Sequence, residues 1–176
     1  MRQLRRLDST YVPRVAAFID QDPMAEVRRP ISARLQPAGN SLDGLSIVHI
    51  VHGWPPFAIG GTEVYAHRLA HAQRRAHRVS VFSRIDDPNR LTSHRMAYWD
   101  HGIRVRLVVN NFDQRNPVAR NALADRRFES ELETFLRQVE PDLVHVHHLA
   151  GHCTSLAHAV ARRGVPMVFQ LQDWWG

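Results

Sequence analysis

The chain of 176 residues carries 23 Lys and Arg against 17 Asp and Glu, a formal net charge of +6, and 44% of its residues are hydrophobic. This composition is typical of a globular protein, and there is no run of about eighteen or more apolar residues to predict a membrane-spanning helix. The positive charge favours anionic partners, with an ordinary solvated basic surface as the alternative. Basic and aromatic residues do not alternate as they do in nucleic-acid platforms, so we expect no nucleic-acid partner.

The N-terminal part differs in pattern from the rest. Four prolines fall within residues 1–44, and residues 37–44 (PAGNSLDG) are linker-like. We interpret residues 1–44 as an extension that is partly disordered or a wrongly assigned start, and residues 45–176 as one domain. The basic first ten residues lack the apolar stretch of a secretory signal, and a single cysteine, Cys153, excludes an intrachain disulfide. We therefore expect a cytoplasmic protein in which Cys153 is a buried, inert thiol.

Strand and helix patterns alternate from residue 45 onward. Residues 45–52 (LSIVHIVH) form a short apolar run typical of a strand, followed by a loop rich in Gly and Pro. A helix is predicted over residues 62–76, with one face formed by Tyr65, Leu69, Ala72 and Ala76. Residues 77–84 predict a second strand, and residues 85–101 a long irregular loop.

The second half of the domain continues the alternation. A helix over residues 125–139 has the apolar stripe Phe128, Leu132, Phe135, Leu136 and Val139, and Pro141 stops it. A helix over residues 154–163 ends at Gly164, which suits a left-handed cap. The remaining apolar runs predict strands at residues 103–109, 143–147 and 165–171.

This order predicts an α/β fold: a Rossmann-like, doubly wound parallel sheet with the strand order 3-2-1-4-5. Ligands of such sheets bind at the carboxyl ends of the strands, near the switch between the first and fourth strands. The loops that follow His52 and His147 are therefore the places to look for a site.

The first loop places Gly60 and Gly61 directly before a helix. Paired glycines allow positive φ and a close approach of the backbone to a ligand, and the amides at the helix start attract phosphate. The alternative is a tight turn with a glycine cap, in which Glu63 reaches back to the helix start as in a capping box. The loop is neither a G-x-G-x-x-G fingerprint nor a P-loop.

Two further loops carry polar or aromatic groups. His145 and His147 alternate and so share one strand face. They are candidates for a metal site, but no carboxylate or cysteine partner stands at helical spacing, so one core histidine and one at the strand end is the favoured interpretation. Asp173 follows the last strand, and Trp174 and Trp175 would stack on a sugar or pack under a partner domain.

Together, the three loops resemble the N-terminal domain of glycosyltransferase family 4. The family's pattern of PP…GGxE, helix and G-H-x-V-x-V is present as VHGWPPFAIGGTEVYAHRLAHAQRRAHRVSVFS. Its PDxVHxHH pattern is present as PDLVHVHHLAG, and its G-[IV]-P-x-V-x-T-x-H-D-x-W pattern as GVPMVFQLQDWWG. The order and spacing agree over about residues 45–176.

The resemblance implies a GT-B fold, of which this chain is the N-terminal, acceptor-side half. It implies a retaining, metal-independent glycosyltransferase that moves a sugar from a nucleoside diphosphate sugar to a glycan or lipid-linked acceptor. It implies no cofactor besides that donor substrate, and a C-terminal domain or partner chain that binds the nucleotide. A lipid-linked acceptor leaves open a peripheral contact with the inner face of the membrane.

Carried over residue by residue, the resemblance assigns His147 and Asp173 to catalysis. It assigns donor-phosphate or substrate binding to Gly60, Gly61, Glu63 and Gln172. A histidine beside the sugar would position hydroxyls and help to stabilise developing charge.

Three departures from the family pattern qualify this assignment. Gln172 replaces the histidine that precedes Asp173, and glutamine cannot carry a proton charge. Ala76 replaces the glycine that ends the first helix. The donor-binding domain lies outside the matched region, so we expect the chain to be inactive alone. A non-catalytic glycan- or protein-binding module is the alternative, and an unrelated Rossmann enzyme is a second one that the missing G-x-G-x-x-G disfavours.

Overall fold

The computed structural model describes residues 17, 21, 26, 44–111, 124–149 and 151–172. The chain divides into two units, Met1–Ser41 and Leu42–Gly176, and the elements discussed below belong to the second. The expectation that residues 1–44 form an extension falls almost entirely outside the described ranges. Within those ranges, no helix has the length and apolar character needed to cross a membrane.

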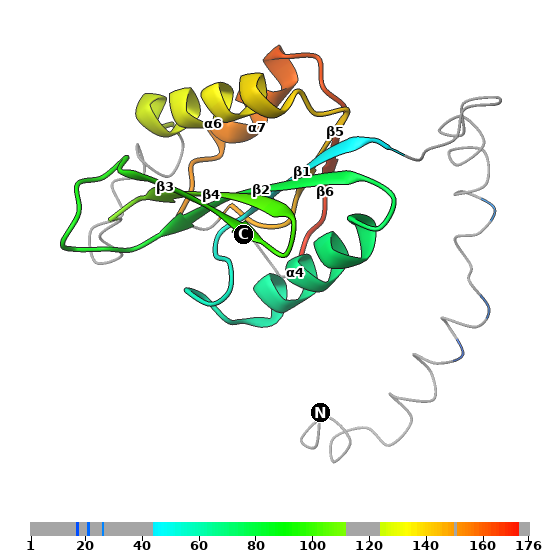
Figure 1. The fold of residues 1–176 in the computed structure, drawn as a ribbon. Helices are drawn as coiled ribbons and strands as arrows, with labels where there is room; N and C mark the ends of the chain where they lie inside the picture. The colour runs from blue at the N-terminus through cyan, green and yellow to red at the C-terminus, as the bar shows by residue number, and fades with distance from the viewer. Residues whose placement is uncertain are drawn as a thin grey trace. The chain divides into compact units, whose positions relative to one another are not determined.

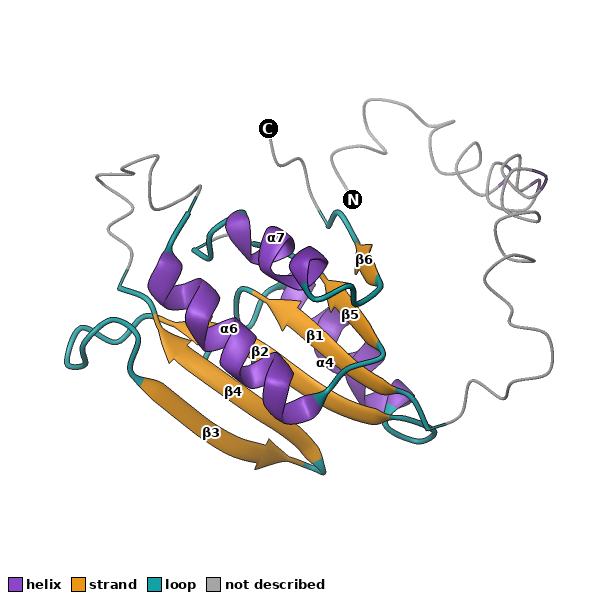
Figure 2. Cartoon of the chain, turned by 90° about the horizontal axis from the view of Figure 1, so that it is seen from above, coloured by secondary structure: helices purple, strands orange, loops and turns teal. Residues whose placement is uncertain are grey.

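Among the described residues of the second unit, six strands form one sheet. Its strand order is β3-β4-β2-β1-β5-β6, and every neighbouring pair is parallel except β3 with β4. Figure 2 shows the strands side by side in this order. The strands are β1 (Ser46–Val51), β2 (Arg78–Ile85), β3 (Arg95–Asp100), β4 (Ile103–Val109), β5 (Leu143–Val146) and β6 (Met167–Phe169). The predicted order of the five parallel strands is confirmed, and β3 is added at one edge.

Three helices cover the two faces of this sheet. The helices α6 (Arg126–Val139) and α7 (Ser155–Arg162) lie on one face, and α4 (Gly61–Gln73) lies on the other (Figure 1). Because β1 and β5 are neighbours while β2 lies on the other side of β1, the chain reverses its direction of travel across the sheet at β1 and β5. The predicted switch between the first and fourth parallel strands is therefore present.

The core under α6 and α7 follows the predicted apolar pattern. The stripe residues Phe128, Leu132, Phe135 and Leu136 are fully buried, and Val139 packs against them. Asp125 caps the start of α6, since its side chain accepts hydrogen bonds from the amides of Arg127 and Phe128 at 2.9 and 3.2 Å.

Both helices on this face end with a positive φ. The left-handed residue Glu140, at φ 44°, ends α6 immediately before Pro141. Gly164, at φ 67°, follows the end of α7 and confirms the predicted left-handed cap.

The face under α4 is different, and the prediction for this helix is wrong in two respects. The helix ends at Gln73 rather than at residue 76, and its buried residues are Glu63, Ala66 and Ala70. Tyr65, Ala72 and Ala76 are exposed, and Leu69 is half-buried. The sheet face that α4 covers carries histidines as well as aliphatic side chains, so small residues and polar groups face inward from the helix.

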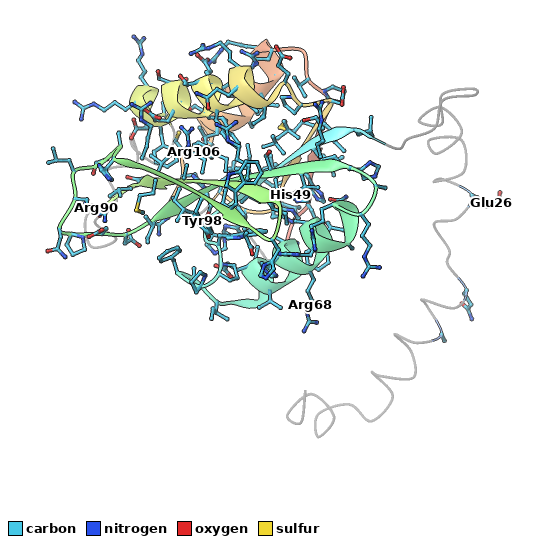
Figure 3. The ribbon with its side chains drawn as sticks, in the orientation of Figure 1. Glu26, His49, Arg68, Arg90, Tyr98 and Arg106 are labelled. Carbon is cyan, nitrogen blue, oxygen red and sulfur yellow. The ribbon has the colours of Figure 1, made fainter. Side chains whose placement is uncertain are left out.

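The predicted loop over residues 85–101 is also wrong in part, because Arg95–Asp100 forms β3. This strand alternates: Met96 and Tyr98 pack against the apolar cluster on the α4 side, while Arg95 and Trp99 are exposed. Figure 3 shows Tyr98 on the α4 side of the sheet and Arg106 of β4 on the side of α6. At the other edge, β6 has three residues instead of the predicted seven, and all three are exposed.

Candidate functional site

The carboxyl ends of the parallel strands bring the predicted loops together. His52 follows β1, and His147 and His148 follow β5, which is hydrogen-bonded to β1. The rings of His52 and His148 lie 4.5 Å apart between centroids. The loop between β1 and α4 and the loop after β5 therefore meet at one edge of the sheet, as the fold predicts.

The loop between β1 and α4, residues 53–60, is called the glycine loop below. Glu63, in the first turn of α4, fills the space inside it. Its Oε1 lies 2.8 Å from Nε2 of the partly exposed His52. A Cβ atom added to Gly60 would lie 2.6 Å from Oε2 of Glu63, and one added to Gly53 would lie 3.0 Å from Oε1. These two glycines therefore leave room for a buried carboxylate that ties the end of β1 to the first turn of α4.

This contact changes the reason for which Gly60 is needed. Gly60 is extended, with φ −142° and ψ −177°, and Gly61 begins the helix, so neither of these glycines takes the positive φ that the sequence suggested. A Cβ on Gly61 would meet no atom within 4 Å. The first amides of α4 nevertheless start at this loop, as the phosphate interpretation requires.

Three histidines form a stacked cluster between the sheet and α4. His49 of β1 lies directly opposite His145 of β5 in the strand register, and His147 follows two residues later on the same face. His49 Nδ1 is 2.7 Å from His147 Nε2, and His49 Nε2 is 2.7 Å from Oε1 of Gln73 on α4. His145 Nε2 is 3.1 Å from Oε1 of Gln170. Figure 3 marks His49 at the centre of the sheet.

Burial keeps this cluster uncharged. Desolvation lowers the pKa of His147 to about 3. The Coulombic effects of His145 and His49 are smaller and act in the same direction. Desolvation also lowers the pKa of His49 to about 4; the hydrogen bond that His49 donates to Gln73 opposes this shift, and the charge of His145 adds to it. Both rings are therefore neutral near pH 7.

The hydrogen bonds also set which ring nitrogen carries the proton. With Oε1 of Gln73 as acceptor, His49 donates from Nε2, and its Nδ1 then accepts from Nε2 of His147. His147 is thereby left with an unprotonated Nδ1, which is buried and has no hydrogen-bond partner among the described residues. His147 thus keeps one acceptor lone pair unused.

A metal ion does not fit this cluster, although its three rings lie close enough together to suggest one. Two ligand atoms bound to tetrahedral zinc lie about 3.3 Å apart, as follows from zinc–nitrogen distances of about 2.0–2.1 Å. The nitrogens of His49 and His147 are only 2.7 Å apart. Their contact is a hydrogen bond.

Arg84 and a small cavity complete this edge. A cavity of about 190 Å³ is lined by His52, Phe57, Ala58, Arg84, Ile85 and Asp86. Arg84 donates to both carboxylate oxygens of Asp86, at 2.7 and 3.0 Å, and to the carbonyl of Asn110 at 3.1 Å. The guanidinium group of Arg84, paired with Asp86, therefore lies beside this cavity at the carboxyl edge of the sheet.

The predicted site residues have different outcomes in the structure. His147, Gly60, Gly61 and Glu63 all lie at or next to the carboxyl edge. Gln172, beyond β6, is half-buried, and its Nε2 has no hydrogen-bond partner within the described ranges. Asp173, Trp174 and Trp175 lie outside the described residues.

Three residues of this region were not anticipated: His49, Gln73 and Arg84. His49 is the one ring in β1 and stands between Val48 and Ile50, and that interruption of the apolar run was a usable signal. The contact of Gln73 with His49 depends on how α4 packs, which no local pattern reveals.

Comparison with known proteins places the chain in a family. The profile described as Glycosyltransferase Family 4 matches residues 59–176, which is more than half of the chain. A search of the curated proteins finds no match.

Three solved structures are similar at low identity. The catalytic domain of starch synthase IV from Arabidopsis thaliana, bound to ADP and acarbose, is 18% identical with a TM-score of 0.45, over 72% of this chain and 33% of that one. Sucrose-phosphate synthase from Thermosynechococcus elongatus is 18% identical with a TM-score of 0.42, over 71% and 32%. The C-terminal domain of a Pyrococcus furiosus hydrogenase is 16% identical with a TM-score of 0.42, over 77% and 100%.

These structural similarities carry no argument about activity, because the identities and TM-scores are too low. The chain spans about a third of the length of the two synthases. The profile match is the stronger finding: it begins at Ile59, within the glycine loop, and covers Gly60, Gly61, the two later loops and the helices α4, α6 and α7. The chain belongs to glycosyltransferase family 4.

Proposed function

We propose that this chain is the acceptor-side domain of a retaining glycosyltransferase that transfers a sugar from a nucleoside diphosphate sugar to a glycan or lipid-linked acceptor. A C-terminal donor-binding domain or chain completes the active site, and residues 1–176 alone do not catalyse transfer. The family match supports the class of enzyme. The basic net charge supports an anionic donor and a lipid-linked acceptor at the cytoplasmic membrane surface.

One observation carries the proposal furthest: two buried polar atoms, for which the described part of the chain supplies no hydrogen-bond partner, follow adjacent strands. His147 Nδ1, beyond β5, is an unused acceptor, and Gln172 Nε2, beyond β6, is an unused donor. Buried polar groups are nearly always hydrogen-bonded, because leaving one unpaired costs about 1–3 kcal/mol. Sugar hydroxyls both donate and accept, so separate hydroxyls of one bound sugar suit the acceptor and the donor.

The proposed roles follow from this arrangement. The first amides of α4, at Gly60 and Gly61, face the donor phosphates, and Glu63 holds the loop in shape through His52. His147 accepts from a sugar hydroxyl, and Asp173 is given a part in the same step by the family resemblance alone. Because His147 is completely buried in the isolated chain, its ring meets the sugar only after the surrounding residues move apart when the donor domain binds. The transfer uses no metal at this edge.

The test uses the protein as its own cell makes it, isolated with whatever accompanies it and weighed intact. We expect either a mass above 20.2 kDa or a bound donor-binding chain. That preparation should consume a nucleoside diphosphate sugar and form a product with the donor's anomeric configuration, read by NMR. His147→Ala should lower kcat/KM at least about 100-fold. His158→Ala, a change on an exposed position of α7, is the matched control.

The outcomes separate the alternatives. Inversion of the anomeric centre would overturn the retaining mechanism, and full activity of His147→Ala would overturn the assigned role. A lone 20.2 kDa species that binds a glycan or protein but no sugar nucleotide would favour the non-catalytic binding module. Gln172, where the family has histidine, is the observation that supports the non-catalytic binding module as a second candidate.

A further inference from the structure

A second group of histidines lies on α4, where it faces the end of β3. His67 and His71 stand four residues apart on α4, so their rings share one face of the helix. Both face Asp100, the last residue of β3, which pairs with Ile103 at the start of β4. Because β3 is antiparallel to β4, Asp100 lies at the amino edge of the parallel strands.

The three side chains converge on one oxygen atom. His67 Nε2 is 3.2 Å from Oδ2 of Asp100, and His71 Nε2 is 3.4 Å from the same atom. The rings of the two histidines lie 4.3 Å apart between centroids. All three ligand atoms lie within 4.8 Å of one another.

Hydrogen bonds alone do not account well for this convergence. The indole N–H of the buried Trp54 also donates to Oδ2 of Asp100, at 3.1 Å. Three donors would then share one carboxylate oxygen, which has two lone pairs. A cation could instead bind one lone pair of Asp100 Oδ2 while Trp54 donates to the other. The two imidazoles would then bind the cation through their own lone pairs, and no lone pair would be shared by two donors.

The distances fit a tetrahedral metal ion. Ligand atoms on zinc lie about 3.3 Å apart for bond lengths of about 2.0–2.2 Å. Two of the three separations here are 3.2 and 3.4 Å, and the third, between the two histidines, is within 4.8 Å. The histidine cluster around His49 fails this comparison, because its nitrogens are only 2.7 Å apart. The same measurement thus distinguishes the two groups.

We propose that His67, His71 and Asp100 bind a divalent transition-metal ion of the zinc class, which joins α4 to the end of β3. Two imidazoles and one carboxylate suit Zn²⁺ and Co²⁺. Trp54 orients the ligand carboxylate through Oδ2, and His101 holds its other oxygen through a contact of 2.8 Å between Nδ1 and Oδ1. The side chains of His67, His71 and Asp100 are 32%, 22% and 13% exposed, so an ion has access from solvent.

The ion would serve a structural purpose at this place. Only Ala66 and Ala70 of α4 contribute buried apolar side chains to the sheet, so the helix gains little from apolar burial. A metal bound to two of its residues and to β3 would hold it in place. None of its ligands is a residue assigned to the metal-independent transfer proposed above, although Trp54, in the loop between β1 and α4, reaches Asp100 through its hydrogen bond.

The test titrates Zn²⁺ and Co²⁺ into the untagged 176-residue chain after treatment with a chelator. We expect one ion per chain, visible absorption from tetrahedral Co²⁺, and a rise in Tm on adding Zn²⁺. His67→Ala and Asp100→Asn should each weaken Zn²⁺ binding at least about 10-fold and remove the rise in Tm. Asp100→Asn keeps the shape of the side chain and an acceptor for Trp54, so it separates loss of metal from loss of folding.

Two control variants address the other histidines. His158→Ala, on α7, and His145→Ala, in the buried cluster, should both leave the Zn²⁺ affinity unchanged. The absence of stoichiometric binding, an unchanged affinity in His67→Ala, or loss of binding in His145→Ala would each overturn the proposal.

Discussion

Buried neutral histidines make the stability of this domain depend on pH, and His152 gives the sharpest test. His152 lies between Phe82 and Phe128, and its Nε2 is 3.0 Å from the carbonyl oxygen of Val51. Burial lowers its pKa from 6.5 to about 3, against the hydrogen bond to Val51 and together with the charges of Arg84, His52 and His148. In the folded chain the ring is therefore neutral down to strongly acidic pH.

The sign of the effect follows from the two pKa values. As the pH falls below 6.5, the unfolded chain binds a proton at this position before the folded chain does, so the free energy of unfolding decreases until the pH approaches 3. Integrating between about pH 7.5 and pH 5 gives a loss of about 2 kcal/mol from this one histidine.

The assay is urea unfolding, followed by circular dichroism, at several pH values between about 7.5 and 5. The comparison is between the wild type and His152→Gln, whose amide can still donate to the carbonyl of Val51. The variant should lose about 2 kcal/mol less than the wild type over this range, whatever its stability at neutral pH. His158→Gln is the exposed control and should keep the wild-type pH dependence. Equal pH dependence in wild type and His152→Gln would refute the assignment of a buried neutral ring.

Two further predictions concern backbone features. Gly60→Ala should destabilise the domain by about 1–3 kcal/mol, because its Cβ would lie 2.6 Å from Oε2 of Glu63 and displace the carboxylate from His52. Gly61→Ala, whose Cβ has open space, should be close to neutral; equal urea midpoints for the two variants would contradict the packing role of Gly60. Asp125→Ala should cost about 1 kcal/mol through loss of the α6 cap. Its thermal unfolding, compared with that of the exposed Ser130→Ala on the same helix, measures this cost, and equal Tm values would exclude the cap.

Long elements with a regular apolar pattern could be predicted from the sequence. Short elements that form only because they pair with a neighbouring strand could not. The stripe of α6 and the cap at Gly164 depend on local spacing, and both are confirmed. The strand β3 was missed because Arg95, Trp99 and Asp100 are polar or exposed, as suits an edge strand with one solvated face. Its alternation with Met96 and Tyr98 was present but short.

The candidate site shows the same division. The sequence placed His147, Gly60 and Glu63 near the switch of the sheet because strand order alone determines which loops meet. It did not reveal that Glu63 contacts His52 or that His49 contacts His147. Those contacts depend on the register of β1 against β5 and on which face of α4 turns inward. The roles given to His147 and Asp173 stay predictions.

The small buried surface of α4 affects how the domain moves. Opening an element locally costs the apolar surface that it exposes. For α6 that surface includes two phenylalanines and two leucines, whereas for α4 it is two alanines and the contacts of Gln73 and Glu63. The helix that begins at the glycine loop is therefore the less costly of the two to release. We therefore expect local opening to release α4 before α6, with the sheet and the helices on its opposite face staying in place.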